Sequence, residues 1–397
     1  MVRERSARRG GRGARRAAVL LVVAGLLVAM AGGAVASTST WTVVAGPNPS
    51  PADNTLDAVA VVSAADAWAV GHSQDAGGTD QTLIAHWNGG AWHQVASPNP
   101  SPAGNQLHGV AAVSATSAWA VGATAASQPL VERWDGASWR VVPAPAPPGG
   151  AVLSDVVALS TTNAWAVGHT GDWSGTVVEH WDGSGWALVA SPSPGSGYNV
   201  LSAVTAASPT DVWAVGALQV LDGGYYQTRT LTEHWDGSAW RVVASPNRTG
   251  SDSVLEDVVG LSASDVWAVG RSYQAGEAAT LTEHWDGRGW SVVASPNPGL
   301  SFNDLQGVAA LSPSDVWAVG TLANGHYNDP SRPAPPRTLT EHWNGRSWKV
   351  VASPNPSTGG DRLNGAAALV PRELWAVGLL QTPSGGTRTL VLHTTQG

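Results

Sequence analysis

The sequence predicts an all-β protein built from repeated units. Twenty of the 21 tryptophans fall in three phrases that recur along the chain, WAVG, H/R-W-D/N-G and W-x-V/L-V. Glycine and proline are abundant, with 47 and 26 residues, and only 13% of the residues are charged. No repeat segment keeps a 3.6-residue apolar period. This composition favours short strands and tight turns over helices.

Each repeat contains four segments with the character of short strands. In the fourth repeat they are residues 201–206, 211–216 (DVWAVG), 230–235 (TLTEHW) and 240–244 (WRVVA). The Asp-Gly or Asn-Gly pair between the last two segments is a strong hairpin signal. WAVG occurs seven times at spacings of 46 to 58 residues, which fits four short strands plus loops. We therefore predict a seven-bladed β-propeller of four-stranded antiparallel blades.

The two ends of the repeat region are complementary. Residues 41–44 (WTVV) supply an outer strand with no WAVG before it, whereas the last WAVG is followed by a third strand at residues 389–393 and no outer one. We expect the N-terminal strand to pair into the last blade and close the propeller. Closure would remove the exposed sheet edge of an open array.

The first 36 residues have the character of a targeting segment. Seven arginines precede an apolar run at residues 17–31 and Ala-Val-Ala at residues 34–36, which is the pattern of a cleaved signal peptide. An uncleaved membrane anchor is the other interpretation, because about 20 apolar residues span a bilayer. The predicted domains are a signal peptide or anchor at residues 1–36 and the propeller at residues 37–397. We expect a secreted or cell-surface protein.

The composition excludes several classes of function. Without residues 1–36 the chain keeps 14 of its 21 basic and 28 of its 29 acidic residues, a formal net charge of -14. So acidic a domain is unsuited to binding the phosphate backbone of nucleic acid. The absence of cysteine excludes thiol catalysis, zinc–thiolate sites and iron–sulfur clusters. Phosphate-loop, HExxH, calcium-loop and G-x-S-x-G motifs are absent, so we expect no metal and no cofactor.

Two phrases resemble known repeats. The W-D-G-x-x-W stretch resembles the Y-D-x(n)-W stretch of Kelch repeats, and D-V-W-A-V-G resembles repeats of secreted bacterial BNR/Kelch-like propellers. The resemblance covers residues 41–397 and implies the propeller fold. WAVG has one glycine where Kelch repeats usually have two, and sialidase-type Asp boxes are absent. The cross-linked tyrosine of galactose oxidase would need a cysteine. The enzymatic activities of these relatives are therefore not implied.

The four connections of each blade divide between two rims. The S-x-x-D turn before WAVG and the Asp-Gly or Asn-Gly hairpin have nearly constant form and lie on one rim, here called the uniform rim. The loop after WAVG and the Pro-rich SPNP segment lie on the opposite rim, the variable rim, and differ between blades. Variable loops on a rigid scaffold are where binding usually resides.

Aromatic residues outside the repeated phrases gather on the variable rim of blades 3 to 6. They are Trp173, Tyr198, Tyr225, Tyr226, Tyr273, Phe302 and Tyr327. Amphipathic aromatic side chains suit stacking and apolar contact with a carbohydrate or a protein. The alternative is that they fold down and cover the blade ends.

A second candidate site is the mouth of the central channel. The inner strand of every blade has a polar residue at an equivalent position, and its identity varies: Asp57, His108, Ser154, Ser202, Glu256, Gln306 and Asn364. These residues either line the channel mouth or are solvated strand ends.

Histidine and acid positions form a repeated pair. Six of the eleven histidines lie in third strands, and an acid usually precedes WAVG. Blade 2 replaces both, with Arg133 and Ser117, which indicates that the two positions contact one another. We interpret the pairs as structural, because buried polar groups are normally satisfied by a partner. His72 with Asp75 and His169 with Asp172 are too far apart in the repeat order to indicate a metal site.

These observations predict an exported, non-catalytic, monomeric propeller that binds a carbohydrate or protein ligand through the variable rim of blades 3 to 6. One alternative is an extracellular glycan-active hydrolase or lyase that uses rim carboxylates, such as Asp222, Glu277, Asp304 and Asp329. The other is a cell-surface scaffold. Contact with a membrane would require an uncleaved N-terminal segment. The sequence leaves the identity of the ligand open.

Overall fold

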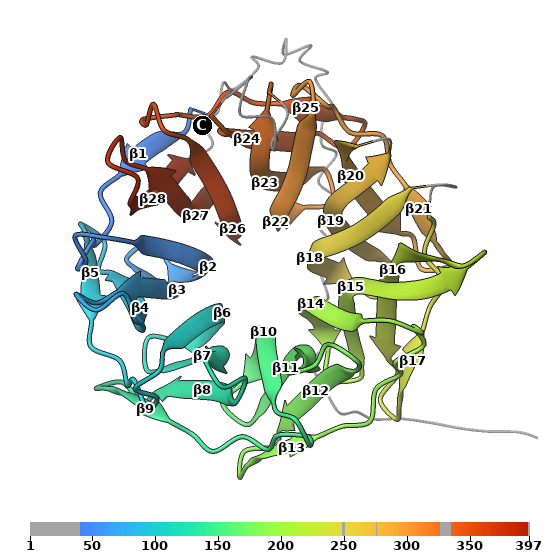
Figure 1. The fold of residues 1–397 in the computed structure, drawn as a ribbon, viewed down its shortest axis with the longest axis horizontal. Helices are drawn as coiled ribbons and strands as arrows, with labels where there is room; N and C mark the ends of the chain where they lie inside the picture. The colour runs from blue at the N-terminus through green and yellow to red at the C-terminus, as the bar shows by residue number, and fades with distance from the viewer. Residues whose placement is uncertain (1–39, 248–250, 275, 326–334, 396–397) are drawn as a thin grey trace, which may run out of the picture. The chain divides into compact units, whose positions relative to one another are not determined.

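The computed structural model describes residues 40–247, 251–274, 276–325 and 335–395, and every regular element in these ranges is a strand. The strands form repeated four-stranded antiparallel blades around a common centre (Figure 1). No helix that could cross a membrane is found in the described ranges. The predicted targeting segment, Tyr327 and Asp329 lie outside them. The fold is all-β, as predicted.

The blades follow one another in sequence order. The first three are β2 (Asn54–Ser63), β3 (Asp66–Gln74), β4 (Asp80–Trp87) and β5 (Trp92–Val95); β6 (Asn105–Ser114), β7 (Ser117–Thr124), β8 (Pro129–Trp134) and β9 (Trp139–Val141); β10 (Ala151–Ser160), β11 (Asn163–Thr170), β12 (Thr176–Trp181) and β13 (Trp186–Leu188). The next three are β14 (Asn199–Ser208), β15 (Asp211–Asp222), β16 (Tyr225–Trp235) and β17 (Trp240–Val242); β18 (Asp252–Ser262), β19 (Asp265–Gln274), β20 (Glu277–Trp285) and β21 (Trp290–Val292); β22 (Phe302–Ser312), β23 (Asp315–Ala323), β24 (Arg337–Trp343) and β25 (Trp348–Val350). The last group is β26 (Asp361–Leu369), β27 (Glu373–Gln381) and β28 (Thr387–Thr395), with β1 (Thr42–Val44) as its outer strand.

Two strand pairings join strands that do not follow one another directly in the sequence. β1 lies antiparallel to β28, with Thr42 opposite His393, although these residues are at opposite ends of the described chain. β20 and β22 of adjacent blades share one parallel bridge, between Ala278 and Phe302.

The inner strand of every blade contains a β-bulge beside the WAVG glycine. In blade 1, Leu56 pairs with Gly71 and the register shifts between Leu56 and Ala58. A Cβ at Gly71 would lie 2.1 Å from the Thr55 carbonyl oxygen, so only glycine permits this approach. A bulge bends the strand and re-aims the extra side chain. The bulged residues are Asp57, His108, Ser154, Ser202, Glu256, Gln306 and Asn364.

The core lies between the blades and is built from tryptophan. The WAVG tryptophan of each blade is almost fully buried and packs against one or two tryptophans of the next blade. Trp213 of blade 4 lies 4.7 Å from Trp285 and 5.3 Å from Trp290 between ring centroids. The same arrangement joins Trp375 of the last blade to Trp87 and Trp92 of the first, at 5.0 and 5.3 Å. Burial of large aromatic side chains therefore joins successive blades.

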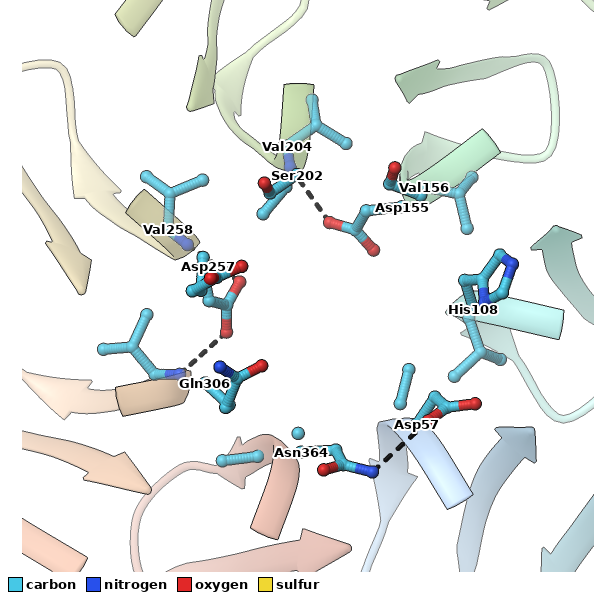
Figure 2. A pocket seen from close by; sticks show the side chains of 18 of the residues that line it. Asp57, His108, Asp155, Val156, Ser202, Val204, Asp257, Val258, Gln306 and Asn364 are labelled. Carbon is cyan, nitrogen blue, oxygen red and sulfur yellow. Dashed lines mark hydrogen bonds between the residues drawn. The ribbon is translucent and has the colours of Figure 1, made fainter. Parts of the chain in front are cut away.

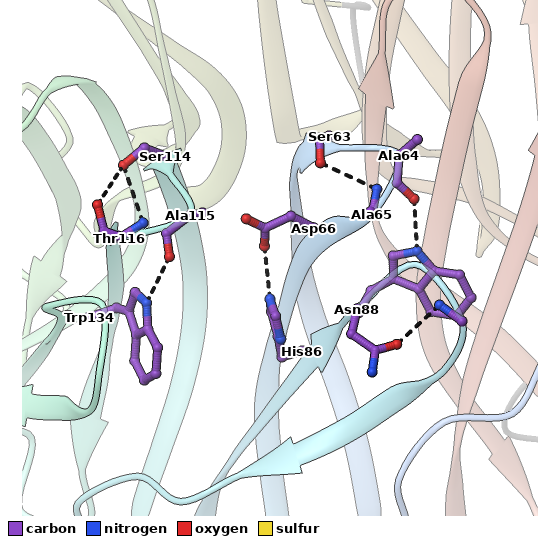
Figure 3. Close-up of polar contacts among 12 residues, drawn as sticks. Ser63, Ala64, Ala65, Asp66, His86, Asn88, Ser114, Ala115, Thr116 and Trp134 are labelled. Carbon is purple, nitrogen blue, oxygen red and sulfur yellow. Dashed lines mark hydrogen bonds and ion pairs between the residues drawn. The ribbon is translucent and has the colours of Figure 1, made fainter.

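The uniform rim repeats the same polar contacts in most blades. The predicted histidine–acid contact is present: His86 Nε2 lies 2.8 Å from Asp66 Oδ1 (Figure 3), and His234 Nε2 lies 2.7 Å from Asp211 Oδ1. The indole N–H of Trp134 donates to the carbonyl of Ala115 in the neighbouring turn, at 3.0 Å. These contacts tie the two turns of a blade together.

In blade 2 an arginine takes the place of the third-strand histidine. The guanidinium carbon of Arg133 lies 5.0 Å from the ring centroid of Trp119 and 5.4 Å from that of Trp181. It therefore lies against the rings of two blades and uses cation–π attraction in place of the histidine–carboxylate contact. The joint replacement of histidine and acid in the sequence has this physical basis.

The glutamate of TLTEHW is buried between blades, which the sequence analysis did not anticipate. Glu132, Glu179, Glu233, Glu283 and Glu341 are fully inaccessible to solvent. Burial raises the pKa of each carboxyl to about 8, so these side chains are largely protonated at neutral pH. Only Glu233 accepts a side-chain hydrogen bond from the described residues, from Ser191 Oγ at 2.9 Å.

Candidate functional site

The inner strands enclose a cavity of about 580 Å³ at the centre of the blades, here called the central cavity (Figure 2). All of the bulged polar residues line it, including the predicted Asp57, His108, Glu256, Gln306 and Asn364. They lie within the strands, so the alternative of solvated strand ends does not describe them. Their role as ligand contacts stays a prediction.

Two further carboxyl groups in the central cavity were missed by the sequence analysis. Asp155 and Asp257 follow the bulged residue in blades 3 and 5, where other blades have alanine or glycine. Asp155 Oδ2 accepts a hydrogen bond from the Val204 amide at 2.9 Å, and Asp257 Oδ2 accepts one from the Val308 amide at 2.7 Å. Each carboxyl is therefore fixed by the next blade.

Both aspartates are poised to exchange protons near neutral pH. Burial raises the pKa of Asp155 to about 7, against the effect of its backbone hydrogen bonds. Burial raises the pKa of Asp257 to about 8, and the charge of Asp155 adds to the rise. The sequence signal was present, since aspartate stands in two blades where the repeat otherwise has a small residue.

Two of the carboxylates that line the cavity, Asp57 and Glu256, are paired with basic side chains beside it. Arg271 Nη1 contacts Glu256 Oε1 and lies 3.1 Å from Asp304 Oδ2. In blade 1 the equivalent base and acid are His72 and Asp57, with Nδ1 3.3 Å from Oδ2. Burial opposes the charge of His72, but its close polar contact with Asp57 and its attraction to that carboxylate outweigh this and raise its pKa.

The predicted aromatic residues divide into two groups. Trp173, Tyr225 and Tyr226 are 53%, 80% and 56% exposed. Tyr198, Tyr273 and Phe302 are half-buried, and Tyr198 donates its hydroxyl to Thr228 Oγ1 at 3.0 Å. The predicted aromatic residues therefore differ in exposure, and their role as a binding surface stays a prediction.

Several of these aromatics lie in extended strands, where loops were expected. β15 and β16 run on to Asp222 and Tyr225, so Tyr225 and Tyr226 stand near the tip of a long hairpin beside the exposed Leu221. Tyr273 and Phe302 likewise belong to β19 and β22. The pairing of strands gives these side chains a fixed backbone.

Hydrogen bonds connect the aromatic positions of blades 3, 4 and 5. The Asn199 amide donates to the Trp173 carbonyl at 2.8 Å, and the Gln219 amide donates to the Tyr198 carbonyl at 2.9 Å. The Thr228 amide donates to Asp252 Oδ1 of the next blade at 2.7 Å. The aromatic surface is therefore continuous with the strands below it.

The remaining candidate residues are not gathered into a catalytic or metal site. Asp222 pairs with Arg229 at 3.3 Å, Asp304 is held by Arg271, and Glu277 is exposed at the start of β20. Asp75 accepts hydrogen bonds from its own loop, and the ring of His169 stacks on Trp173. Within the described ranges, no group of three or more His, Asp or Glu side chains could hold a metal ion.

Comparison with known proteins supports the fold. No protein-family model and no curated protein matches the chain. The structure is similar to YCF48 bound to a D1 peptide, with a TM-score of 0.55, 15% identity, and coverage of 91% of this chain and 96% of that one. It is also similar to a protein of unknown function from Dyadobacter fermentans, with a TM-score of 0.51, 12% identity, and coverage of 90% and 98%.

A polysaccharide lyase of family PL25, an ulvan lyase bound to a GlcA(1-4)Rha3S unit, has a TM-score of 0.52 at 10% identity, with coverage of 85% of this chain and 94% of that one. Identities this low show the fold alone. With its repeated blades and its propeller neighbours, the chain belongs to the class of β-propellers.

Proposed function

We propose that the protein is an exported, non-catalytic propeller that binds a carbohydrate through the variable rim of blades 3 to 6. This proposal rests on the position of the Trp173 ring. Its ring stacks on His169, with centroids 3.9 Å apart and planes at 21°, and it remains 53% exposed. An indole face fixed in this way can pack against the C–H face of a sugar ring while the sugar hydroxyls stay hydrated.

The loop that presents Trp173 is ordered by its own hydrogen bonds. Trp173 has a left-handed backbone with φ of 65°, and its amide donates to the Thr170 carbonyl at 2.8 Å. Hydrogen bonds from Thr170 and Ser174 lower the pKa of Asp172 to about 2, so this carboxylate stays ionised and keeps the loop folded. A preorganised aromatic side chain loses little conformational entropy when it binds.

The shared fold accommodates more than one ligand class. One structural neighbour is bound to a peptide and another to a saccharide unit. In this chain, the exposed Leu221 beside Tyr225 and Tyr226 would also suit an apolar polypeptide. A protein ligand is therefore an outcome that the test must distinguish.

The test measures binding of the purified protein to a glycan array and, in parallel, to an array of peptides. Trp173→Ala and the double variant Tyr225→Ala/Tyr226→Ala should each weaken carbohydrate binding about tenfold or more, the usual loss for a central aromatic contact. Leu188→Ala is the control, because Leu188 is an exposed apolar residue on the outer strand of the same blade as Trp173. Unchanged binding by both rim variants, or binding of peptides only, would overturn the proposal.

A glycan-active hydrolase or lyase is the second candidate, and Asp155 and Asp257 favour it. Two carboxyl groups with pKa values raised to about 7 and about 8 suit general acid and base catalysis near neutral pH. Release of reducing or unsaturated ends from polysaccharides, abolished by Asp155→Asn or Asp257→Asn, would establish this activity. Binding without any product formation would remove it.

We also propose that the blades close into one seven-bladed ring and that residues 1–36 direct export. Closure is supported by the pairing of β1 with β28 and by a hydrogen bond from Asn364 Nδ2 to the Leu56 carbonyl at 3.0 Å, which joins the last blade to the first. Export would be contradicted if the protein remained in the cells that make it. A Kelch/BNR-like ancestry stays a proposal that rests on the repeat phrases.

A further inference from the structure

We propose that the central cavity is a separate subsite for one uncharged, hydroxyl-rich residue of the glycan that the variable rim holds. This inference rests on the proposed carbohydrate binding and adds to it a place, a ligand class and a set of contacting residues. Figure 2 shows the side chains of Asp57, His108, Ser202, Gln306 and Asn364 around the opening, each from a different blade.

The fold alone does not account for the residues at the bulge. Leucine always precedes the bulged residue, and valine follows three residues after that leucine in every blade except the last, which has alanine. The bulged residue itself changes in nearly every blade while remaining polar. A position required only for packing would repeat in the same way as its neighbours, so this variation points to contacts made outside the fold.

Charge at the cavity favours an uncharged ligand. Arg271 lies between Glu256 and Asp304, and His72 pairs with Asp57. A cationic ligand would have to compete with Arg271 and His72 for these carboxylates, and an anionic ligand would meet several carboxyl groups. Breaking a partly buried ion pair to admit a charged ligand is unfavourable.

Unused hydrogen-bonding groups face the cavity. The side chains of His108, Ser154 and Ser202 line it, and no hydrogen bond joins them to another residue in the described ranges. Burial lowers the pKa of His108, so its neutral ring offers one donor and one acceptor. A sugar hydroxyl also donates and accepts, and would satisfy these groups.

Size and apolar lining agree with this ligand class. The volume of about 580 Å³ is within the range of about 300–1,000 Å³ typical of small-molecule sites. Valine side chains, among them Val156, Val204 and Val258, form the wall beneath the polar positions. The cavity therefore offers apolar surface for the C–H groups of a sugar and polar groups for its hydroxyls.

The experiment uses the full chain and probes of defined charge. The probes are hexaoses of β-1,4-linked glucose, mannose and xylose, with hexagalacturonate as the anionic and chitosan hexaose as the cationic counterpart. Isothermal titration calorimetry gives the affinity of the wild type and of two cavity variants. His108→Ala/Ser154→Ala removes polar groups, and Ser202→Phe fills space. Ala207→Phe is the matched control, because Ala207 is exposed near the other end of β14.

We expect a neutral hexaose to bind best and both cavity variants to weaken its binding about tenfold, with Ala207→Phe unchanged. Circular dichroism and thermal unfolding establish that each variant is folded; if Ser202→Phe is not, the double variant still provides the test. Wild-type affinity in the double variant would overturn the inference and show a cavity filled by water alone. Stronger binding of either charged hexaose would overturn the ligand class.

The two proposals fail in different ways. If Trp173→Ala weakens binding and the cavity variants do not, the rim binds carbohydrate and the cavity subsite is wrong. If neither the probes nor a glycan array shows binding, the proposed function fails and the subsite fails with it. Because the rim and cavity sites are separate, their effects should be close to additive when the variants are combined.

Discussion

The uniform rim and the variable rim of the same blades use their polar and aromatic side chains differently. On the uniform rim, His86, His234, His284 and His342 contact an aspartate of the same blade, and the nearby indole N–H groups donate to turn carbonyls. On the variable rim, Trp173, Tyr225 and Tyr226 leave much of their surface exposed. Side chains satisfied within the fold stabilise it, whereas exposed ones on an ordered backbone remain available for a ligand.

The largest expected effect is on the free energy of unfolding, which should respond very differently to loss of a buried and of an exposed tryptophan. Trp213→Ala should lower the free energy of unfolding by about 3–5 kcal/mol, because it empties a packed site between two blades. Trp173→Ala should change it by less than about 0.5 kcal/mol, as expected for a surface position. Urea unfolding followed by circular dichroism measures both. A comparable loss in the two variants would show that the variable rim is structural.

The buried glutamates predict that the protein is more stable in acid than in base. In the unfolded chain Glu283 titrates near 4.5, and in the folded protein burial raises its pKa to about 8. Between these values the unfolded state binds fewer protons, so stability is lost as pH rises from about 4.5 to about 8. At about 1.36 kcal/mol per pH unit, the loss of unfolding free energy from this one glutamate is at most about 5 kcal/mol. We expect roughly half of that loss.

Glu283→Gln should therefore raise the free energy of unfolding by about 2 kcal/mol at pH 9 relative to its effect at pH 5. Urea unfolding at the two pH values measures this difference. Glu277→Gln is the control, because Glu277 is exposed at the start of the same strand. An equal effect of Glu283→Gln at both pH values would mean that the carboxyl finds a partner when it ionises.

The positions of the strands could be predicted from the repeated phrases, because each phrase meets a steric requirement of the fold. The WAVG glycine permits the close approach at the bulge, and the tryptophan three residues before it fills the space between blades. The buried glutamates were missed although alternation places Glu233 on the same face of β16 as the buried Leu231. In this propeller both faces of the third strand are covered, so a charged residue of that strand can be fully buried.

The candidate site was less predictable than the fold. The position of the bulge depends on the register between two paired strands, and the sequence of one strand alone does not determine that register. For this reason the polar inner residues could be read as strand ends, and the role of Asp155 and Asp257 went unnoticed. Which aromatics are exposed was equally open, since it depends on how far hairpins such as β15–β16 extend.

The smallest expected effects concern the histidine–acid pairs of the uniform rim and test whether these pairs stabilise the fold. His234 and Asp211 lie 2.7 Å apart and are only partly exposed, so each single alanine substitution should cost about 1–2 kcal/mol. The double variant should cost less than the sum, with a coupling of about 1 kcal/mol in a double-mutant cycle. Additive losses would mean that proximity on this rim has no energetic consequence.

Blade 2 offers a matched replacement for the same pair. Asp211→Ser/His234→Arg copies Ser117 and Arg133, and the new arginine could lie between Trp213 and Trp285 as Arg133 lies between Trp119 and Trp181. We expect this variant to recover about half of the loss seen in the double alanine variant, because cation–π contact replaces the histidine–carboxylate hydrogen bond. Since the exchange is confined to the uniform rim, carbohydrate binding should be unchanged. A loss of binding would show that the two rims are coupled.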